Sequence, residues 1–317
     1  MKTYKIIDLF AGIGGIRLGF EQAAARLNIS LKCTFTSEID KYCQISYMTN
    51  FGKSEIYGDI CKIDPVDVPN HDLLLAGFPC QPFSQAGLRN GFKDTRGTLF
   101  FNIEQIIKYK RPQAFLLENV KHLKGHDQGR TFKIIVSSLE ELGYKVYNAI
   151  LNARDFGLPQ NRERLFIVGF LDHNIKFEFP ISRNRQTRLE DILMESVENK
   201  YIISDKLWAG HQRRKLQHRK KGNGFGYGLF SKKSQYVNTL SARYYKDGSE
   251  ILIDRGDNLN PRKLTPRECA RLQGFPDDFI IKVSDIQAYK QFGNSVPVNV
   301  INDVAYAMFS SILSLSA

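Results

Sequence analysis

Residues 4–15, YKIIDLFAGIGG, decide the fold of this chain. The apolar run Tyr4–Phe10 predicts a buried strand, the glycines that follow predict a tight turn, and Ile16–Leu27 predicts a helix. A glycine turn between a strand and a helix lets the backbone approach a ligand closely. The GxGxxG pattern of dinucleotide sites would require glycine at position 17, where this chain has Arg17, so the sequence argues against NAD.

The alternation of strands and helices continues over the first half of the chain. Strands are predicted at Lys32–Ser37, Asp72–Ala76, Ala114–Leu117, Val146–Leu151 and Leu165–Phe170, and helices at Tyr42–Asn50, Phe100–Tyr109 and Phe132–Leu142. We therefore expect a doubly wound, mostly parallel α/β domain formed by residues 1–180 and 285–317, with a last helix over Val296–Leu313. Residues 181–284 are expected to form a smaller, loop-rich domain with a hinge, because 201–260 is basic, glycine-rich and without clear periodicity.

The composition is that of an ordinary globular protein: 317 residues, 42% hydrophobic and 25% charged, which excludes collagen, coiled coil and disorder. No stretch reaches the ~18 uncharged apolar residues of a membrane span. Asp8 interrupts the N-terminal apolar run, so we expect no signal peptide, no membrane segment and a cytoplasmic location. The five cysteines form no CxxC pair and no histidine stands at ligand spacing from them, which argues against disulfides and metal.

Positive charge is concentrated in one part of the chain. The net charge is +12, and residues 205–233 hold nine lysines and arginines against one acid. Such a concentration favours a polyanionic partner such as nucleic acid. A solvated charged surface would have the same composition.

A thiol and a carboxyl group follow two of the predicted strands. Cys80 lies in GFPCQPFS (77–84), directly after one strand, and Glu118 follows another. Doubly wound folds place active sites at the carboxyl ends of strands. Arg162 and Arg164 open a further strand and could bring two guanidinium groups to the same edge. Each alone has an ordinary explanation, but together they supply a nucleophile, an acid and an anion binder.

Two other acidic residues stand at positions that are suited to binding a nucleoside. Glu38 ends the second predicted strand, where an acid in such folds accepts hydrogen bonds from ribose hydroxyls. Asp59 stands in Gly58-Asp59-Ile60. These positions fit a nucleoside-bearing cofactor without a pyrophosphate better than a dinucleotide.

Over nearly its whole length the chain resembles the DNA (cytosine-5) methyltransferases of bacterial restriction–modification systems. The matching blocks, in the order of the family, are DLFAGIGG (8–15), the acid Glu38, GFPCQPFS (77–84), ENV (118–120), QNRER (160–164), RKLTPRECARLQGFP (262–276) and QFGNSVPV (291–298). The resemblance implies the Rossmann-like fold of S-adenosylmethionine-dependent methyltransferases, S-adenosyl-L-methionine as methyl donor and a cytosine of double-stranded DNA as acceptor. It also implies that the enzyme protects host DNA beside a cognate restriction endonuclease, a functional rather than a physical partner.

The resemblance assigns roles to individual residues. Cys80 matches the nucleophile, Glu118 the acid on the cytosine ring, and Arg162 and Arg164 the basic pair. The cofactor positions are Phe10, Gly12, Gly14, Glu38, Ile39, Asp59, Ile60, Pro79, Leu99 and Asn294, and the expected DNA contacts are Ser84, Lys220, Lys221, Tyr227, Thr239 and Arg243. Many relatives carry at position 39 a tryptophan that packs on adenine, whereas this chain has Ile39, which can still offer an apolar contact.

The chemistry accounts for these residue types. Addition of the Cys80 thiolate at C6 makes C5 nucleophilic. Glu118 relieves the charge by donating a proton to N3, for which its pKa should be raised, and Arg164 can bind O2. The base that removes the C5 proton, a water or a side chain, is not identified. Because C5 and C6 are stacked inside duplex DNA, the cytosine must be flipped out.

The basic region then has a specific interpretation as the target-recognition domain. GNGFGYG (222–228) with TLSARYYKDGSEILID (239–254) looks like bacterial enzymes that act on CC(A/T)GG, and GNGFGY also recurs in CCGG enzymes. We expect a CC-x-GG or CCGG site with Arg243 on a guanine, the alternative being a hairpin scaffold with no reading role. Both strands of such a site read alike, so a monomer suffices. An RNA methyltransferase on the same scaffold is the first rival function, and a catalytically inactive DNA-bound regulator is the second.

Overall fold

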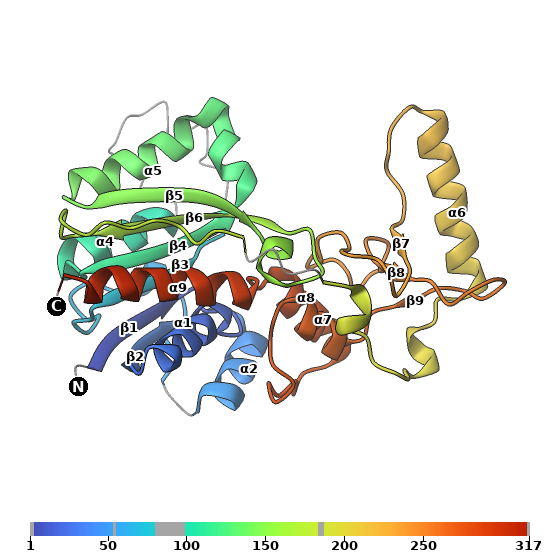
Figure 1. The fold of residues 1–317 in the computed structure, drawn as a ribbon, viewed down its shortest axis with the longest axis horizontal. Helices are drawn as coiled ribbons and strands as arrows, with labels where there is room; N and C mark the ends of the chain where they lie inside the picture. Colours follow the sequence, from blue (N-terminus) through green and yellow to red (C-terminus); the bar gives the residue numbers. More distant parts are fainter. Residues whose placement is uncertain (1–2, 53–54, 80–98, 183–186, 316–317) are drawn as a thin grey trace. The chain divides into compact units, whose positions relative to one another are not determined.

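The computed structural model describes residues 3–52, 55–79, 99–182 and 187–315. The chain forms two compact units (Figure 1). The first consists of Met1–Leu151, Glu163–Ile181 and Val300–Ala317, and the second of Asn152–Arg162 and Ser182–Asn299. This division differs from the expected one, which placed residues 152–162 and 285–299 in the first unit. The side chains of Gln160 and Arg162 hydrogen-bond to segments around residues 240, 272 and 293–295, which holds both stretches in the second unit.

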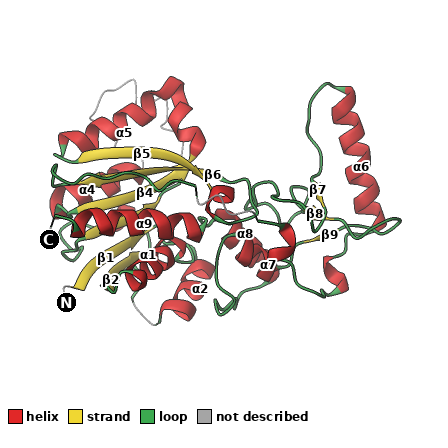
Figure 2. Cartoon of the chain, viewed as in Figure 1, coloured by secondary structure: helices red, strands yellow, loops and turns green. Residues whose placement is uncertain are grey.

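The first unit contains a six-stranded sheet with the order β2-β1-β3-β4-β6-β5. Its strands are β1 (Thr3–Leu9), β2 (Ser30–Ser37), β3 (Leu73–Gly77), β4 (Ala114–Val120), β5 (Lys145–Asn152) and β6 (Glu163–Phe170). β1 pairs in parallel with β2 and β3, β3 pairs in parallel with β4, and β6 runs antiparallel to β4 (Figure 2). The predicted α/β fold with a mostly parallel sheet is confirmed.

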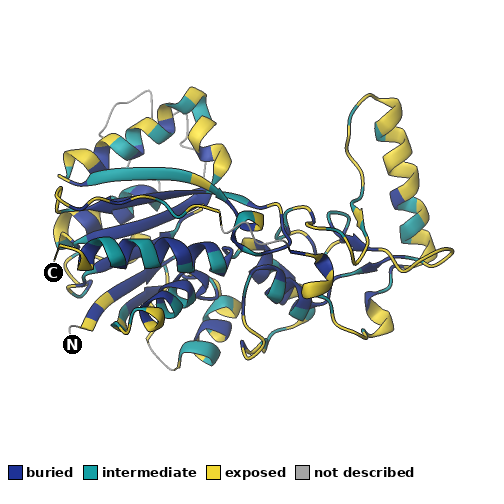
Figure 3. Cartoon of the chain, viewed as in Figure 1, coloured by how far each residue is buried: buried dark blue, intermediate teal, exposed yellow. Residues whose placement is uncertain are grey.

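Helices cover both faces of this sheet. They are α1 (Gly15–Arg26), α2 (Lys41–Phe51), α4 (Leu99–Lys110), α5 (Arg130–Glu141) and α9 (Val298–Leu313). Because strand side chains alternate, Ile7 and Leu9 join the apolar cluster beneath α4 and α5. On the opposite face the ring of Phe309 in α9 lies 5.6 Å from Tyr4 and 5.8 Å from Phe20 of α1. The strands β1, β3, β4 and β6 are therefore buried along most of their length, whereas β5 at the edge of the sheet is only partly buried (Figure 3).

The second unit combines helices with short strands. Its helices are α6 (Asp205–Lys220), α7 (Pro266–Leu272) and α8 (Asp285–Asn294), and its strands are β7 (Leu229–Phe230), β8 (Leu252–Ile253) and β9 (Arg262–Lys263). α6 contradicts the expectation of a stretch without regular structure. Its N-terminus is capped by Ser204, whose Oγ accepts a hydrogen bond from the Leu207 N–H at 3.3 Å. Since only His211 of this helix is buried, it carries no apolar periodicity (Figure 3).

The segment Asp285–Leu313 is long and apolar enough to cross a membrane by length and composition. Ser295–Pro297 divides it into α8 and α9, and 61% of its most apolar window is buried inside the protein. Burial of this kind is typical of a core helix.

Candidate active site

The glycine turn after β1 is held in a left-handed backbone conformation. Phe10, Gly12 and Gly14 have φ angles of 54°, 56° and 82°. A Cβ on Gly14 would lie 2.2 Å from the Phe51 ring, so packing against α2 requires glycine there. Among the residues that the structure describes, apart from its chain neighbours, none has an atom within 4 Å of a Cβ added at Gly12. A ligand can therefore approach the backbone of the turn at this position.

Glu38 closes this turn from the end of β2. Its Oε2 accepts a hydrogen bond from the Gly12 N–H at 2.7 Å, and its Oε1 accepts one from the Asp40 N–H at 2.7 Å. Each carboxylate oxygen has capacity for a further hydrogen bond. Ile39, at the next position, is 70% exposed. An acid and an accessible apolar side chain thus stand side by side at the open edge.

Asp59 is brought to the same edge by backbone pairing. The Glu38 N–H donates to the Tyr57 carbonyl at 2.9 Å, and the Ser37 hydroxyl donates to the Gly58 carbonyl at 2.8 Å. Asp59 caps the short 3-10 helix Ile60–Lys62 by accepting the Cys61 N–H at 3.0 Å.

Apolar side chains complete this cradle. Phe10 and Leu99, the first residue of α4, pack against a buried cluster that includes Ile60. The set of two acids, an open glycine and apolar side chains fits an adenosine, because it offers acceptors for hydroxyl and amino groups and apolar faces for a base.

A buried polar network, which the sequence analysis did not predict, connects the end of β1 with the helices α1 and α2. The Tyr47 hydroxyl donates to Asp8 Oδ2 at 3.2 Å and accepts from Arg17 at 3.2 Å. Arg17 also pairs with Glu21 at 2.7 Å. Burial raises the pKa of Asp8 to about 7, although Arg17 and Tyr47 oppose the rise. Asp8 lies near the end of β1, two residues before Phe10.

The second group of predicted residues lies where β3 and β4 end. Gly77 pairs in parallel register with Glu118, and a Cβ on Gly77 would lie 3.5 Å from Glu118 Oε2. The Asn119 side-chain amide donates to the Phe78 carbonyl at 2.8 Å. The backbone that leads to the predicted nucleophile is therefore held beside Glu118 up to Phe78, and Pro79 follows with an exposed side chain. Cys80 and Ser84 lie outside the described residues.

Glu118 forms an ion pair with Arg164 on the adjacent strand β6. Arg164 Nε lies 3.1 Å from Glu118 Oε1, and both side chains are largely buried. Burial lowers the pKa of Arg164, and Glu118 acts in the opposite direction. The raised pKa that we expect for Glu118 stays a prediction.

Arg162 lies in the second unit, and its side chain is 1% exposed. Its guanidinium donates to the main-chain carbonyls of Leu240, Gly293 and Ser295 at 2.7, 3.0 and 2.5 Å. Both terminal nitrogens of Arg162 thus donate to main-chain carbonyls, and its place in a catalytic pair stays a prediction. Asn294, the predicted cofactor contact, is exposed between two of these carbonyls.

The predicted DNA contacts fall into two classes. Lys220, Lys221 and Arg243 are exposed. Thr239 donates from its hydroxyl to the Asn161 carbonyl at 2.6 Å. The Tyr227 ring packs 4.7 Å from Trp208 of α6, and Lys215 Nζ lies 4.2 Å from its centroid. Tyr227 thus supports α6 instead of presenting a free ring.

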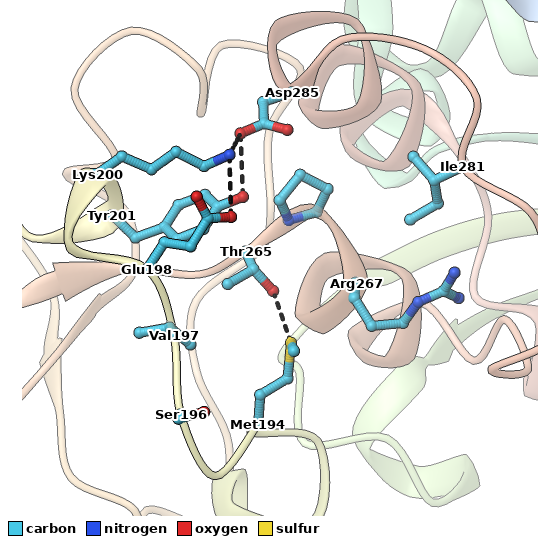
Figure 4. Close-up of a pocket in the computed structure, with 11 residues that line it drawn as sticks. Met194, Ser196, Val197, Glu198, Lys200, Tyr201, Thr265, Arg267, Ile281 and Asp285 are labelled. Carbon is cyan, nitrogen blue, oxygen red and sulfur yellow. Dashed lines mark hydrogen bonds and ion pairs between the residues drawn. The ribbon is translucent and has the colours of Figure 1, made fainter.

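One pocket of the second unit contains none of the predicted residues (Figure 4). Its volume is about 470 Å³, and its lining includes Glu198, Lys200 and Asp285. Lys200 Nζ lies 3.2 Å from Glu198 and 3.3 Å from Asp285, which also accepts a hydrogen bond from Tyr201. Because these charged groups are paired with one another, we assign no ligand to this pocket.

Comparison with known proteins agrees with these features. Residues 4–310 match the family model described as C-5 cytosine-specific DNA methylase. Type II methyltransferase M.NlaX of Neisseria lactamica is 60% identical over 99% of this chain and 98% of its own length. M1.ScrFI of Lactococcus lactis subsp. cremoris is 62% identical over 96% of this chain and 78% of its own length.

Solved structures share the fold at low identity. The Entamoeba histolytica methyltransferase EhMeth has a TM-score of 0.78 at 20% identity and covers 98% of this chain and 99% of its own. The S. pombe Dnmt2 methyltransferase has a TM-score of 0.78 at 21% identity, with both chains covered completely. At this identity the likeness concerns the fold alone.

Proposed function

The chain belongs to the C-5 cytosine-specific DNA methylase family, and on that premise we propose which of its residues carry the reaction and which DNA it modifies. It is a C-5 cytosine DNA methyltransferase of a type II restriction–modification system that uses S-adenosyl-L-methionine. The observation that supports the residue assignment best is the Glu118–Arg164 ion pair at the end of β4, beside the end of β3 that leads to Cys80.

At this edge Cys80 acts as the nucleophile. Its thiolate forms a bond to C6 of a flipped cytosine, and the ring electrons move towards N3 and C5. Glu118 holds a proton at N3 and so stabilises the addition product, while Arg164 orients the ring through O2. After C5 has gained its methyl group, a base takes the C5 proton and the electrons of that bond re-form the C5–C6 double bond. The bond between sulfur and C6 then breaks and the thiolate leaves.

The cradle after β1 holds the methyl donor. Glu38 and Asp59 bind the polar atoms of the adenosine, and Ile39, Phe10 and Leu99 contact its apolar faces. Bound there, S-adenosyl-L-methionine supplies an electrophilic methyl group to C5. The open space at Gly12 and the remaining acceptor capacity of Glu38 support this assignment.

The second unit, with Ser182–Asn299 as its main part, reads the target. We assign Arg243 to a guanine of a CC-x-GG or CCGG site, because an exposed arginine can donate two hydrogen bonds to guanine O6 and N7. Lys220 and Lys221 neutralise phosphates without reading sequence. The enzyme acts as a monomer in the cytoplasm and protects DNA from a separate endonuclease.

Methylation mapping tests this proposal. Duplex DNA treated with the enzyme and the methyl donor is read by bisulfite sequencing, which names both the base and the site. We expect 5-methylcytosine confined to CC-x-GG or CCGG sites. Modified cytosines elsewhere would overturn the target, and labelled methyl transfer to transfer RNA instead of duplex DNA would favour the RNA rival.

A further inference from the structure

We propose that Arg162 is a positioning residue that sets the target-recognition loop Thr239–Arg243 against the block Gln291–Val298. The proposal rests on the proposed function, which gives Arg243 the reading role and Asn294 a contact with the methyl donor. It gives Arg162 a different role from Arg164, two positions away, although the two residues look equivalent in the sequence.

The side chain of Arg162 joins two distant segments of the second unit. One guanidinium nitrogen donates to the Leu240 carbonyl at 2.7 Å, and another donates to the carbonyls of Gly293 and Ser295 at 3.0 and 2.5 Å. Leu240 is itself buried. A planar guanidinium can span two such segments in fixed geometry, whereas a lysine ammonium is a single point donor.

The backbones of the same two segments are in direct contact. A Cβ on Gly293 would lie 2.3 Å from the Ser241 carbonyl oxygen and 2.5 Å from the Ala242 nitrogen. Position 293 therefore accepts only glycine without a shift of the recognition loop. Arg243, the predicted reading residue, follows Ala242 directly.

Gln160 adds a parallel set of bonds from the same short segment. Its Oε1 accepts the Leu240 N–H at 2.9 Å, and its Nε2 donates to the Leu272 carbonyl at 3.1 Å. Gln273, next to Leu272, donates in turn to the Phe292 carbonyl at 2.7 Å. Residues 160–162 are thus the node at which the recognition loop and the 291–298 block are fixed.

This geometry predicts a specific loss of function when the hydrogen bonds of residues 160–162 are removed. The groups that perform chemistry, Cys80, Glu118 and Arg164, are unchanged, but Arg243 and Asn294 lose their common support. Misplacement of a reading arginine reduces discrimination between bases, and misplacement of Asn294 weakens binding of the donor.

The test compares Arg162→Lys with Arg164→Lys in the full-length enzyme, with Arg188→Met as an exposed control in the second unit. Initial rates are measured on duplexes with a cognate site or one substituted base pair. The KM values for DNA and donor, kcat and thermal melting are measured for every variant. Gly293→Ala, which displaces the same loop without touching Arg162, provides a second perturbation in case Arg162→Lys folds poorly.

We expect Arg162→Lys to keep kcat on the cognate site within about threefold of the wild type while both KM values rise. Discrimination against the substituted site should fall by about 5- to 150-fold, the range of one bidentate base contact. Gly293→Ala should reproduce this pattern, whereas Arg164→Lys should lower kcat.

Two results would overturn the proposal. A loss of kcat of about 10²–10⁴-fold in Arg162→Lys with unchanged discrimination would make Arg162 catalytic. A lower melting temperature with unchanged kinetics per folded enzyme would make it purely structural. If the wild type methylated no DNA cytosine at C5, the proposed function itself would fail, which is a separate outcome.

Discussion

Arg164 Nε lies 3.1 Å from Glu118 Oε1, although the two residues belong to antiparallel strands in which Arg164 faces Val120. The pair is largely buried, so it keeps a carboxylate and a guanidinium at one fixed edge of the sheet. A pyrimidine that enters there meets an oxygen that can carry a proton and a donor for a carbonyl. The arrangement suits a ring that gains charge at N3 and must be held through O2.

Replacement of Glu118 by glutamine removes the group that can carry a proton but keeps its shape. We expect Glu118→Gln to slow methyl transfer by about 10²–10⁴-fold, with donor affinity unchanged because the cradle at Glu38 is a separate site. Labelled methyl transfer and calorimetric binding of the donor measure the two effects. A normal rate combined with weak donor binding would reverse both assignments.

Glu38 should control donor binding. Glu38→Gln replaces an acceptor oxygen by an NH₂ group that faces a backbone N–H of Gly12 or Asp40. We expect donor affinity to fall by about 10- to 150-fold, since hydrogen bonds to charged groups contribute about 1.5–3 kcal/mol. Glu190→Gln, an exposed residue of the second unit, is the matched control. Equal donor affinity in both variants would remove Glu38 from the cofactor site.

Asp8 makes stability depend on pH. Its pKa is raised from 3.8 to about 7 by burial, so between these values the folded protein binds more protons than the unfolded chain. Its contribution to the unfolding free energy is full below about pH 4 and is lost as pH rises through 7, by up to about 1.4 kcal/mol per pH unit. Asp8→Asn should therefore gain stability relative to the wild type from pH 4 to 8. Denaturant melts that differ by a constant amount across this range would contradict the assignment.

Mutations should distinguish residues that recognise bases of the target site from residues that bind DNA phosphates. Arg243→Ala should cost about 1–3 kcal/mol of discrimination at one guanine. Lys220→Ala and Lys221→Ala should weaken all DNA equally and reduce the slope of log K against log salt by about 0.9 for each phosphate that is no longer neutralised. Competition binding with cognate and substituted duplexes at several salt concentrations measures both. If Arg243→Ala weakened all duplexes equally, Arg243 would bind phosphate instead of a base.

The sequence predicted the centre of the sheet because strands such as β3 are buried on both faces and have uninterrupted apolar runs, here Leu73–Ala76. It predicted the strand, the glycine turn and the helix at its start because the apolar run and the glycines follow one another directly, while the binding of a cofactor by Glu38 stays a prediction. It missed α6, whose exposed surface leaves no apolar stripe to recognise.

The different interactions of Arg162 and Arg164 could not be predicted from the sequence. Both are arginines in one short block, and only tertiary structure shows that one bonds to Gly293 and Leu240 while the other pairs with Glu118. The sequence did not predict the buried network at Asp8 for the same reason. Its partners Arg17 and Tyr47 come from two different helices, α1 and α2.

Covalent trapping on 5-fluorocytosine tests the central assignment most directly, because fluorine at C5 cannot leave as a proton does. Duplex DNA with this base at the methylated position is incubated with enzyme and methyl donor and analysed on denaturing gels. The wild type should give a stable protein–DNA adduct that peptide mapping places at Cys80, and Cys80→Ser should bind the same duplex without forming one. Absence of an adduct with the wild type, or an equal adduct with Cys80→Ser, would contradict the assignment of Cys80 as the nucleophile.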